Sequence, residues 1–436
     1  MISISRAGFC NRFCLPLPRK SLGPVTERDE ESLEPLPSLK HFGSDVNMTS
    51  VDIETFLNLM PNVTSVSLPK CRGHLVVRCL LKTNRSFRSL HISIGNLPDD
   101  ALTRLMRRCE DSLEQLRLRG GGSLKPEAIS AICRCSKLEH LCIETAYNFG
   151  DCHMKELVSS APDLITLELR QCYSLTDNCV THMHDFRGLQ KLILSSARHL
   201  SSPAKCILAG IISLQELNFD EMHLSNDLLQ SMTNLKDLRK LAVLSTIDSQ
   251  GFDIICTNFE RLESLEVDCS RLSEVDGKNL QRLKNLRRLN LKQCFGFTDV
   301  TFTEGICRLG LEQLSISDCC GLTGLGISRI NTRRGPLREL SLNRCSRILD
   351  SDLENVLRRG IFLRSLSVYH CRSLSNLWVR VLHNCRMRLE RLELDSRTLD
   401  ESSLQALRTL GPTLEVSHSC PRIEMERLES MVVRHF

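Results

Sequence analysis

A nine-residue phrase with the pattern Leu-x-x-Leu-x-Leu-x-x-Cys recurs along this chain of 436 residues. LRRLNLKQC, which begins at Leu286, and LRELSLNRC, which begins at Leu337, are two clear copies. Successive copies begin 24 to 26 residues apart, with a mean of about 25. Such regular spacing indicates one structural unit repeated many times. The fourteen copies begin at Val63, Phe87, Leu113, Leu138, Leu164, Leu189, Leu214, Leu238, Leu262, Leu286, Leu311, Leu337, Leu363 and Leu389.

Each copy combines a strand signal with a helix signal. In the copy at Leu286, the apolar residues Leu289 and Leu291 alternate with polar residues, which predicts a strand. The following residues have helical spacing, and Thr298 or Asp299 can cap a short helix there. The unit therefore consists of one strand followed by one helix.

The period and the two-part unit together predict the fold. One strand and one helix bury too little surface alone, but stacked units share a continuous core. About 25 residues is the period of the leucine-rich repeat. We therefore predict an α/β leucine-rich-repeat solenoid, a horseshoe of about 14–15 repeats. A parallel sheet should line its concave face, with helices outside, and a degraded last copy lies near Leu414.

The repeats set the expected domain organisation. Residues 1–35 are charged and Pro-flanked toward their end and predict a disordered leader. Residues 36–62 are either an eroded repeat or a remnant adaptor-binding segment. Residues 63–420 contain the cysteine-containing repeats, and residues 421–436 suit a capping helix over the last core edge.

Cysteines occupy the ninth position of the phrase in several copies. Free cysteine is small, usually buried and a weak hydrogen-bond donor, so it can fill the space below a turn and donate to a backbone carbonyl. A catalytic thiol would appear once rather than at a repeated position. We therefore predict structural roles for these side chains, and no metal, because no matching second pair of ligands is visible. The six residues are Cys71, Cys172, Cys294, Cys319, Cys345 and Cys371.

Composition and charge restrict the location and the partners. Lys plus Arg is 57 and Asp plus Glu is 52, with the signs interspersed, so nothing demands a nucleic acid or an anionic membrane. No signal peptide or long apolar run is visible, so the 22 cysteines indicate reduced thiols in the cytoplasm or nucleus. Residues 1–26 lack acidic side chains and contain several Arg, as mitochondrial presequences do, but their prolines argue against an amphipathic helix.

The phrase also predicts which side chains face a partner. Positions three, five, seven and eight should point out from the concave face, where interfaces favour Tyr and Arg as anchors. Tyr369 is the best single candidate, because the fold requires no aromatic residue at its position. The alternative is an ordinary solvated strand face. The predicted partner-binding residues are Arg117, Arg119, Arg170, Asn343, Arg344, Tyr369 and His370.

The cysteine-bearing units and their sequel C-x-x-[LI]-[TSL]-[DS] resemble the repeats of F-box leucine-rich-repeat proteins. They are also similar to repeats of antagonist-of-mitotic-exit proteins. Residues 164–177 and 286–375 carry the closest match, and looser copies extend it over about residues 60–420. The resemblance implies that the repeats hold a substrate protein for an SCF-type cullin ubiquitin ligase. An F-box would bind its Skp-type adaptor, and the captured protein would go to ubiquitin-dependent proteasomal degradation.

The sequence departs from that family at the F-box. Leu36-Pro37 and, later, Thr55-Phe56-Leu57-Asn58-Leu59 are present, but the Cys-x-x-Trp close is not. The spacing from Leu36 to Val63 is 27 residues, close to the repeat period, which favours an eroded repeat. The alternative function is therefore an F-box-free scaffold that binds and sequesters a regulatory protein.

No enzyme is predicted. No cofactor motif is recognisable, and repeated placement accounts for most of the ordered cysteines. The N-terminal arginines allow nucleic-acid binding only weakly, because no aromatic stacking platform accompanies them in the sequence. The expected partners are a substrate protein on the concave face and, through the resemblance, a Skp-type adaptor and a cullin.

Overall fold

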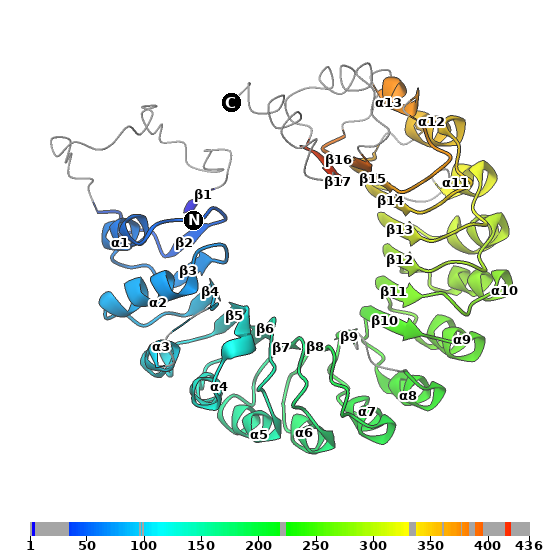
Figure 1. Cartoon of the computed structure of the whole chain (residues 1–436). Coiled ribbons are helices and arrows are strands. Elements are labelled where there is room, and N and C mark those ends of the chain that lie inside the picture. Colours follow the sequence, from blue (N-terminus) through cyan, green and yellow to red (C-terminus); the bar gives the residue numbers. More distant parts are fainter. Residues whose placement is uncertain are drawn as a thin grey trace. The chain divides into compact units, whose positions relative to one another are not determined.

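The structure is a computed structural model that divides into unit 1 (Met1–Leu214) and unit 2 (Gln215–Phe436). Within each unit, strands and helices alternate along the chain, and the helices cover one face of a sheet (Figure 1). We call the other face the strand face. The residues that the structure describes are 2–4, 35–95, 97, 100–218, 224–330, 337–359, 362–375, 377–382, 389–395 and 415–419.

Unit 1 begins with a short strand and continues as strand–helix pairs. Its elements are β1 (Ile2–Ile4), β2 (His41–Ser44), α1 (Ser50–Leu59), β3 (Ser65–Leu68), α2 (Gly73–Lys82), β4 (Ser89–Ser93), α3 (Ala101–Cys109), β5 (Gln115–Arg119), η1 (Gly121–Ser123), α4 (Pro126–Cys133), β6 (His140–Ile143), α5 (Asp151–Ser160), β7 (Thr166–Leu169), α6 (Asp177–Met183), β8 (Lys191–Leu194) and α7 (Ser202–Leu208).

Unit 2 continues the pattern with shorter helices, some of them 3₁₀ or π. Its elements are β9 (Glu216–Asn218), α8 (Asn226–Ser231), η2 (Met232–Asn234), β10 (Lys240–Thr246), α9 (Ser249–Asn258), β11 (Ser264–Asp268), α10 (Glu274–Lys278), η3 (Asn279–Arg282), β12 (Arg288–Lys292), η4 (Thr301–Ile306), β13 (Gln313–Ser317), α11 (Gly324–Ile330), β14 (Glu339–Asn343), α12 (Asp350–Arg359), β15 (Ser365–Tyr369), α13 (Leu377–Leu382), β16 (Arg391–Asp395) and β17 (Glu415–Ser419).

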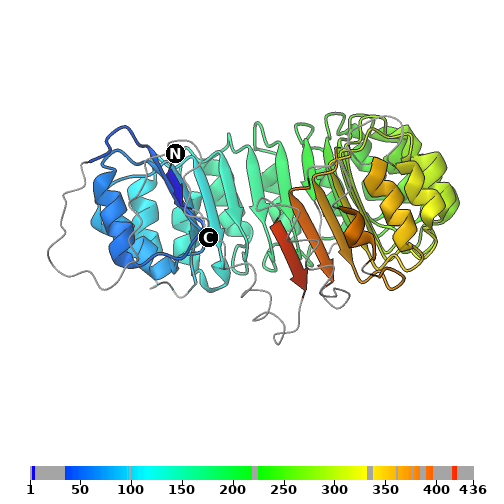
Figure 2. The same ribbon diagram turned by 90° about the horizontal axis from the view of Figure 1, so that it is seen from above.

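All strand pairs are parallel, and within each unit every strand pairs with the next one along the chain (Figure 2). Equivalent positions are in register: Leu289 of β12 is opposite Leu314 of β13, which is opposite Leu340 of β14. A strand lies in each of the fourteen predicted copies. The fold prediction is confirmed. Each unit is a leucine-rich-repeat solenoid.

The repeated apolar positions form the core. In the copy at Leu286, the side chains of Leu286, Leu289 and Leu291 are buried between the sheet and the helix layer. Phe297 and Phe302 from the second half of the same unit close this layer from the helix side. Complete burial of one such side chain contributes roughly 1.5–3 kcal/mol. The core therefore grows with each repeat, without a large central cluster.

Position eight of the phrase has a left-handed backbone where the strand ends. Gly120 occupies it with φ 76°, a conformation that glycine adopts without strain. Six other copies place a residue with a side chain there, at φ between 52° and 58°. This turn directs the chain from the strand toward the helix layer. The six residues are Gln171, Ser196, Gln293, Asp318, Arg344 and His370.

The expected cap at Thr298 or Asp299 is corrected in one respect. The helix that follows is the π-helix η4, preceded by Val300. The Thr298 hydroxyl accepts a hydrogen bond from the Val300 N–H at 3.3 Å. Asp299 instead accepts hydrogen bonds from Thr323 in the next repeat, so its carboxylate joins two neighbouring repeats.

The N-terminal segment resembles the units that follow it. In residues 36–62, β2 pairs in parallel with β3, and α1 buries Ile53 and Leu57. The short strand β1 lies within the expected disordered leader and pairs with β2. The rest of that leader and the expected capping helix at 421–436 lie outside the described residues.

Candidate functional site

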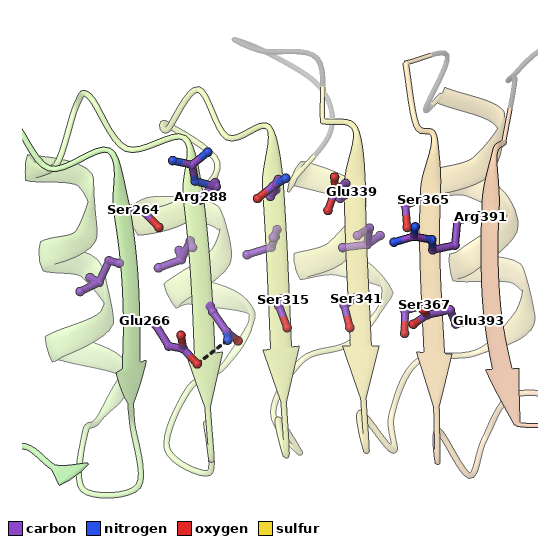
Figure 3. A pocket seen from close by; sticks show the side chains of 16 residues that line it. Ser264, Glu266, Arg288, Ser315, Glu339, Ser341, Ser365, Ser367, Arg391 and Glu393 are labelled. Carbon is purple, nitrogen blue, oxygen red and sulfur yellow. Dashed lines mark hydrogen bonds between the residues drawn. The ribbon is translucent and has the colours of Figure 1, made fainter. Parts of the chain in front are cut away.

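A polar groove crosses the strand face of unit 2 (Figure 3). Its volume is about 350 Å³, and it extends from β11 to β16. Positions three and five of the nine-residue phrase supply the polar side chains, because alternate residues of a strand point to the same face. We call it the serine groove. Its polar lining is Ser264, Glu266, Arg288, Asn290, Gln313, Ser315, Glu339, Ser341, Ser365, Ser367, Arg391 and Glu393.

Small hydroxyl side chains form the floor of the serine groove. Ser315, Ser341 and Ser367 occupy position five of three successive strands and are opposite one another in the sheet. Each ends in a single hydroxyl, which both donates and accepts a hydrogen bond. A partner can therefore approach the sheet closely at this row and exchange hydrogen bonds with it.

Charged side chains of both signs surround that floor. Lys292 forms an ion pair with Glu266 at 2.7 Å, and the Asn290 amide donates to the same carboxylate at 2.9 Å (Figure 3). Arg288 and Glu339 line the opposite row at position three. The groove therefore presents alternating charge around small polar groups. Its described lining residues include no His, Cys or Lys.

Four of the predicted partner-binding residues adjoin this groove at the ends of β14 and β15. Asn343 is opposite Tyr369, each two residues beyond a serine of the floor. The Arg344 N–H donates to the Tyr369 carbonyl at 2.8 Å, and the Arg344 guanidinium lies 3.4 Å from Asp318. The rings of Tyr369 and His370 are 6.4 Å apart. The structure thus brings Asn343, Arg344, Tyr369 and His370 together.

The other three predicted residues lie in unit 1, where two of them, Arg117 and Arg170, lie beside one buried carboxylate. Glu168 of β7 is only 3% exposed. Its oxygens lie 3.7 Å from Arg117 and 3.9 Å from Arg170. Lys191 of β8 is closest, at 2.6 Å. Arg119 lies on the same face but pairs with Glu144 at 3.1 Å.

The surrounding cations keep Glu168 ionised. Burial alone raises the pKa of this carboxyl group, but the Lys191 ammonium, the Cys142 thiol and the Arg117 guanidinium outweigh burial and hold the pKa below its ordinary value. The Cys142 thiol donates to Glu168 at 3.4 Å. Sequence reasoning predicted Arg117 and Arg170 as partner-binding residues and did not name Glu168 or Lys191. Glu168 is at position five of its copy and Lys191 at position three of the next copy. Both positions face the same side of the sheet, and this was the signal in the sequence that could have found them.

The six repeat cysteines are all buried. The Cys172 thiol points to the Ser195 carbonyl at 3.2 Å, and the Cys345 thiol points to the Asn343 carbonyl at 3.6 Å. Burial raises the pKa of Cys172 and of Cys319 to about 12, so both thiols are protonated at neutral pH. A protonated, enclosed thiol is a poor nucleophile.

The described ranges contain neither a cluster of metal ligands nor a helix that could span a membrane. No group of three or more His, Cys, Asp or Glu side chains there is arranged to hold a metal ion. None of the helices with described residues is long and apolar enough to cross a bilayer.

Comparison with known proteins gives distant relatives. No family model matches the chain. A 206-residue segment is 26% identical to the candidate RNA-binding protein EEED8.10 of Caenorhabditis elegans, covering 45% of this chain. The match spans about a quarter (27%) of that protein's length.

Three solved structures share low identity with the chain. A chain from the yeast Rad7–Elc1 complex is 16% identical, with 84% of this chain and 71% of that chain covered and a TM-score of 0.34. The Leptospira interrogans leucine-rich-repeat protein LIC12759 is 14% identical, with 82% and 91% covered and a TM-score of 0.35. The internalin InlF from Listeria monocytogenes is 15% identical, with 84% and 82% covered and a TM-score of 0.34.

Proposed function

We propose that the chain is a non-enzymatic recognition protein whose serine groove binds a partner protein. The observation that carries the proposal is the row formed by Ser315, Ser341 and Ser367, with charges of both signs around it. This lining offers hydrogen bonds and ion pairs. Such a surface suits a folded or extended polypeptide, which presents many donors and acceptors at once.

The dimensions of the serine groove support a polypeptide partner. Six neighbouring strands at a spacing of about 4.8 Å extend roughly 24 Å across. An α-helix, with a diameter of about 10–12 Å, lies within that width. An extended segment of about seven residues, at roughly 3.3 Å per residue, crosses the whole width. The serine groove and its rim at Tyr369 therefore offer a continuous contact rather than an isolated pocket.

The repeat resemblance suggests the machinery in which this recognition is used. We propose that the chain is a substrate-recognition subunit of an SCF-type cullin ubiquitin ligase. The captured protein would then be selected for ubiquitin-dependent proteasomal degradation. The cysteine-bearing phrases at residues 164–177 and 286–375 support this assignment.

One observation favours the second candidate, an F-box-free scaffold that sequesters its partner. Residues 36–62 form a strand and a helix, and β2 continues the sheet beside β3. The Leu36 N–H donates to the Leu59 carbonyl at 2.6 Å, so the two ends of the segment are hydrogen-bonded to each other. This arrangement supports a repeat in place of an F-box in that segment.

The groove proposal is tested with Ser341→Arg in the full chain. Arg117 occupies the same position of β5 and is exposed, so an arginine there is compatible with the strand. The matched control is Ser351→Arg on the exposed surface of α12. Each tagged chain is purified from cells with the proteasome blocked, and bound proteins are identified by mass spectrometry. We expect Ser341→Arg, but not Ser351→Arg, to lose the partner. Equal recovery by both variants would remove the groove as the binding site.

The same purification distinguishes the two candidates. Recovery of a Skp-type adaptor and a cullin supports the ligase subunit, and a stable partner without them supports the scaffold. Val51 is an apolar residue of α1 that is 70% exposed, so an adaptor bound to this segment would contact it. Val51→Asp should then release the adaptor but retain the groove partner.

A further inference from the structure

Two tyrosines and an arginine lie against one another at the end of the strands of unit 1. Tyr147, Tyr173 and Arg198 all occupy position ten of successive copies, in the turns that follow β6, β7 and β8. The rings of Tyr147 and Tyr173 have centroids 5.4 Å apart, and the Arg198 guanidinium lies 5.7 Å from the Tyr173 ring. We call this set the tyrosine ladder. Sequence reasoning missed it, although equal positions in adjacent copies predict adjacent side chains.

The ladder remains open to solvent. Tyr147 is 40% exposed and Tyr173 is 36% exposed, although aromatic side chains of this size are usually covered. The preceding copy has Gly122 at the same position, and a Cβ there would lie 3.0 Å from the Tyr147 ring. A side chain at Gly122 would therefore push against the ring. Because Gly122 has no side chain, Tyr147 is the first aromatic residue of the ladder and no side chain at position ten of the preceding copy packs on its ring.

Positive charge lies beside the ladder. Arg119 and Arg170 are at position seven of their copies, and Arg170 is three residues before Tyr173. Arg198 has no carboxylate partner among the described side chains. Arg117 and Lys191 add two more cations on the same strands' open face. Two carboxylates, Glu144 and Glu168, accompany these five cations on β5 to β8 and the turns as far as Arg198. They form ion pairs with four of the five, which leaves more positive than negative charge on this part of the strand face.

We propose that the tyrosine ladder and the adjacent arginines bind single-stranded nucleic acid. Such binding combines aromatic faces for bases with a positively charged track for phosphates. Both parts are present: exposed rings at Tyr147 and Tyr173, and a surplus of positive charge at Arg198 and the cations of the neighbouring strands. The residues next to the rings, Asn148 and Ser174, are polar. An extended strand places its phosphates toward the arginines and its bases on the tyrosines.

The proposal is tested by fluorescence anisotropy of the full chain with labelled 12-nucleotide oligo(U), oligo(dT) and a 12-base-pair duplex at 50 mM salt. We expect both single strands to bind and the duplex to bind much more weakly. Tyr147→Ala with Tyr173→Ala should weaken oligo(U) binding about tenfold or more, since each stacked base contributes substantially. The control, Tyr147→Phe with Tyr173→Phe, retains the rings and should stay within about twofold. Circular dichroism verifies that each variant is folded.

Several outcomes would overturn the proposal. No binding of either oligonucleotide at 50 mM salt is one, and equal affinity for single strand and duplex is another, since plain charge explains it. Unchanged affinity in the alanine double variant also contradicts it. If the alanine variant instead loses a captured protein while no oligonucleotide binds, the ladder is a protein contact. The serine groove lies in the other unit, so Ser341→Arg should leave oligonucleotide binding unchanged, and the two proposals fail separately.

Discussion

Asp299 accepts hydrogen bonds from the backbone N–H of Thr323 at 2.8 Å and from its hydroxyl at 2.6 Å, across the boundary between two repeats. Thr323 immediately precedes α11, so the carboxylate of one repeat orders the start of the next repeat's helix. The same relationship joins Asp151 to Thr176 and Asp350 to Ser375. These residues couple neighbouring repeats through polar contacts that add to the shared apolar core.

We expect Asp299→Ala to lower the free energy of unfolding of unit 2 by about 1–2 kcal/mol, because it removes the hydrogen bonds to Thr323. Asp299→Asn should cost less, since the amide oxygen can still accept. Urea unfolding followed by circular dichroism measures both. Asp237→Ala, which removes an exposed ion pair with Arg261 in the same unit, is the control and should cost well under 1 kcal/mol. A loss for Asp299→Ala no larger than this control would show that the contact contributes nothing.

The sequence predicted the fold well because the determinants are local and repeated. Each leucine of the copy at Leu286 has the burial that alternation implies, and the register of β12 follows from the phrase. The cysteine positions were informative for the same reason. A repeated position has a repeated environment, so one rule serves all copies.

The parts that could not be predicted depend on contacts between copies. Glu168 is at position five of its copy, which predicted an exposed side chain. Lys191 and two arginines from nearby strands instead cover it. The link from Asp299 to Thr323 spans 24 residues, so reading one copy alone assigned the carboxylate to its own helix. The pairing of Tyr147 with Tyr173 likewise becomes visible only when copies are compared side by side.

We expect the buried thiols to make the protein sensitive to alkali. The pKa of Cys135, Cys172 and Cys319 is raised by burial to about 12 in the folded state, against roughly 8.5 when unfolded. Below about pH 8.5 both states keep the proton, so stability is unaffected. Between about 8.5 and 12 the unfolded state releases it, and the free energy of unfolding falls by up to about 1.4 kcal/mol per pH unit for each thiol.

Urea midpoints at pH 8, 9 and 10 measure this dependence. Lysine and tyrosine titration also changes stability in this range, so the decisive comparison is with Cys172→Ala and Cys319→Ala. Each variant should show a shallower decline between pH 9 and 10 than the parent chain. Identical slopes would mean that these thiols titrate alike in the folded and unfolded states.

The rim of the serine groove provides a test of partner capture. Tyr369→Ala with Arg344→Ala should weaken capture of the groove partner about ten- to a hundredfold, because Tyr and Arg anchors dominate interfaces. The control, Phe362→Ala with Arg358→Ala, removes the same kinds of side chain from exposed positions outside the strand face. Binding of the chain to its captured partner is measured by titration, with circular dichroism as the folding check. Unchanged capture would show that the ends of β14 and β15 are not part of the interface.

Substitution of Cys345 tests the structural role of the repeat cysteines. The side chain is fully buried and its thiol points to the Asn343 carbonyl at 3.6 Å. Cys345→Asp should lower the free energy of unfolding by about 3–5 kcal/mol, because it encloses a carboxylate without a cationic partner. Cys345→Ser retains the size and the donor, so it should cost only about 1–2 kcal/mol. Urea unfolding of the three chains measures the difference, and a Cys345→Asp protein as stable as Cys345→Ser would show that the position tolerates charge and is not part of a packed layer.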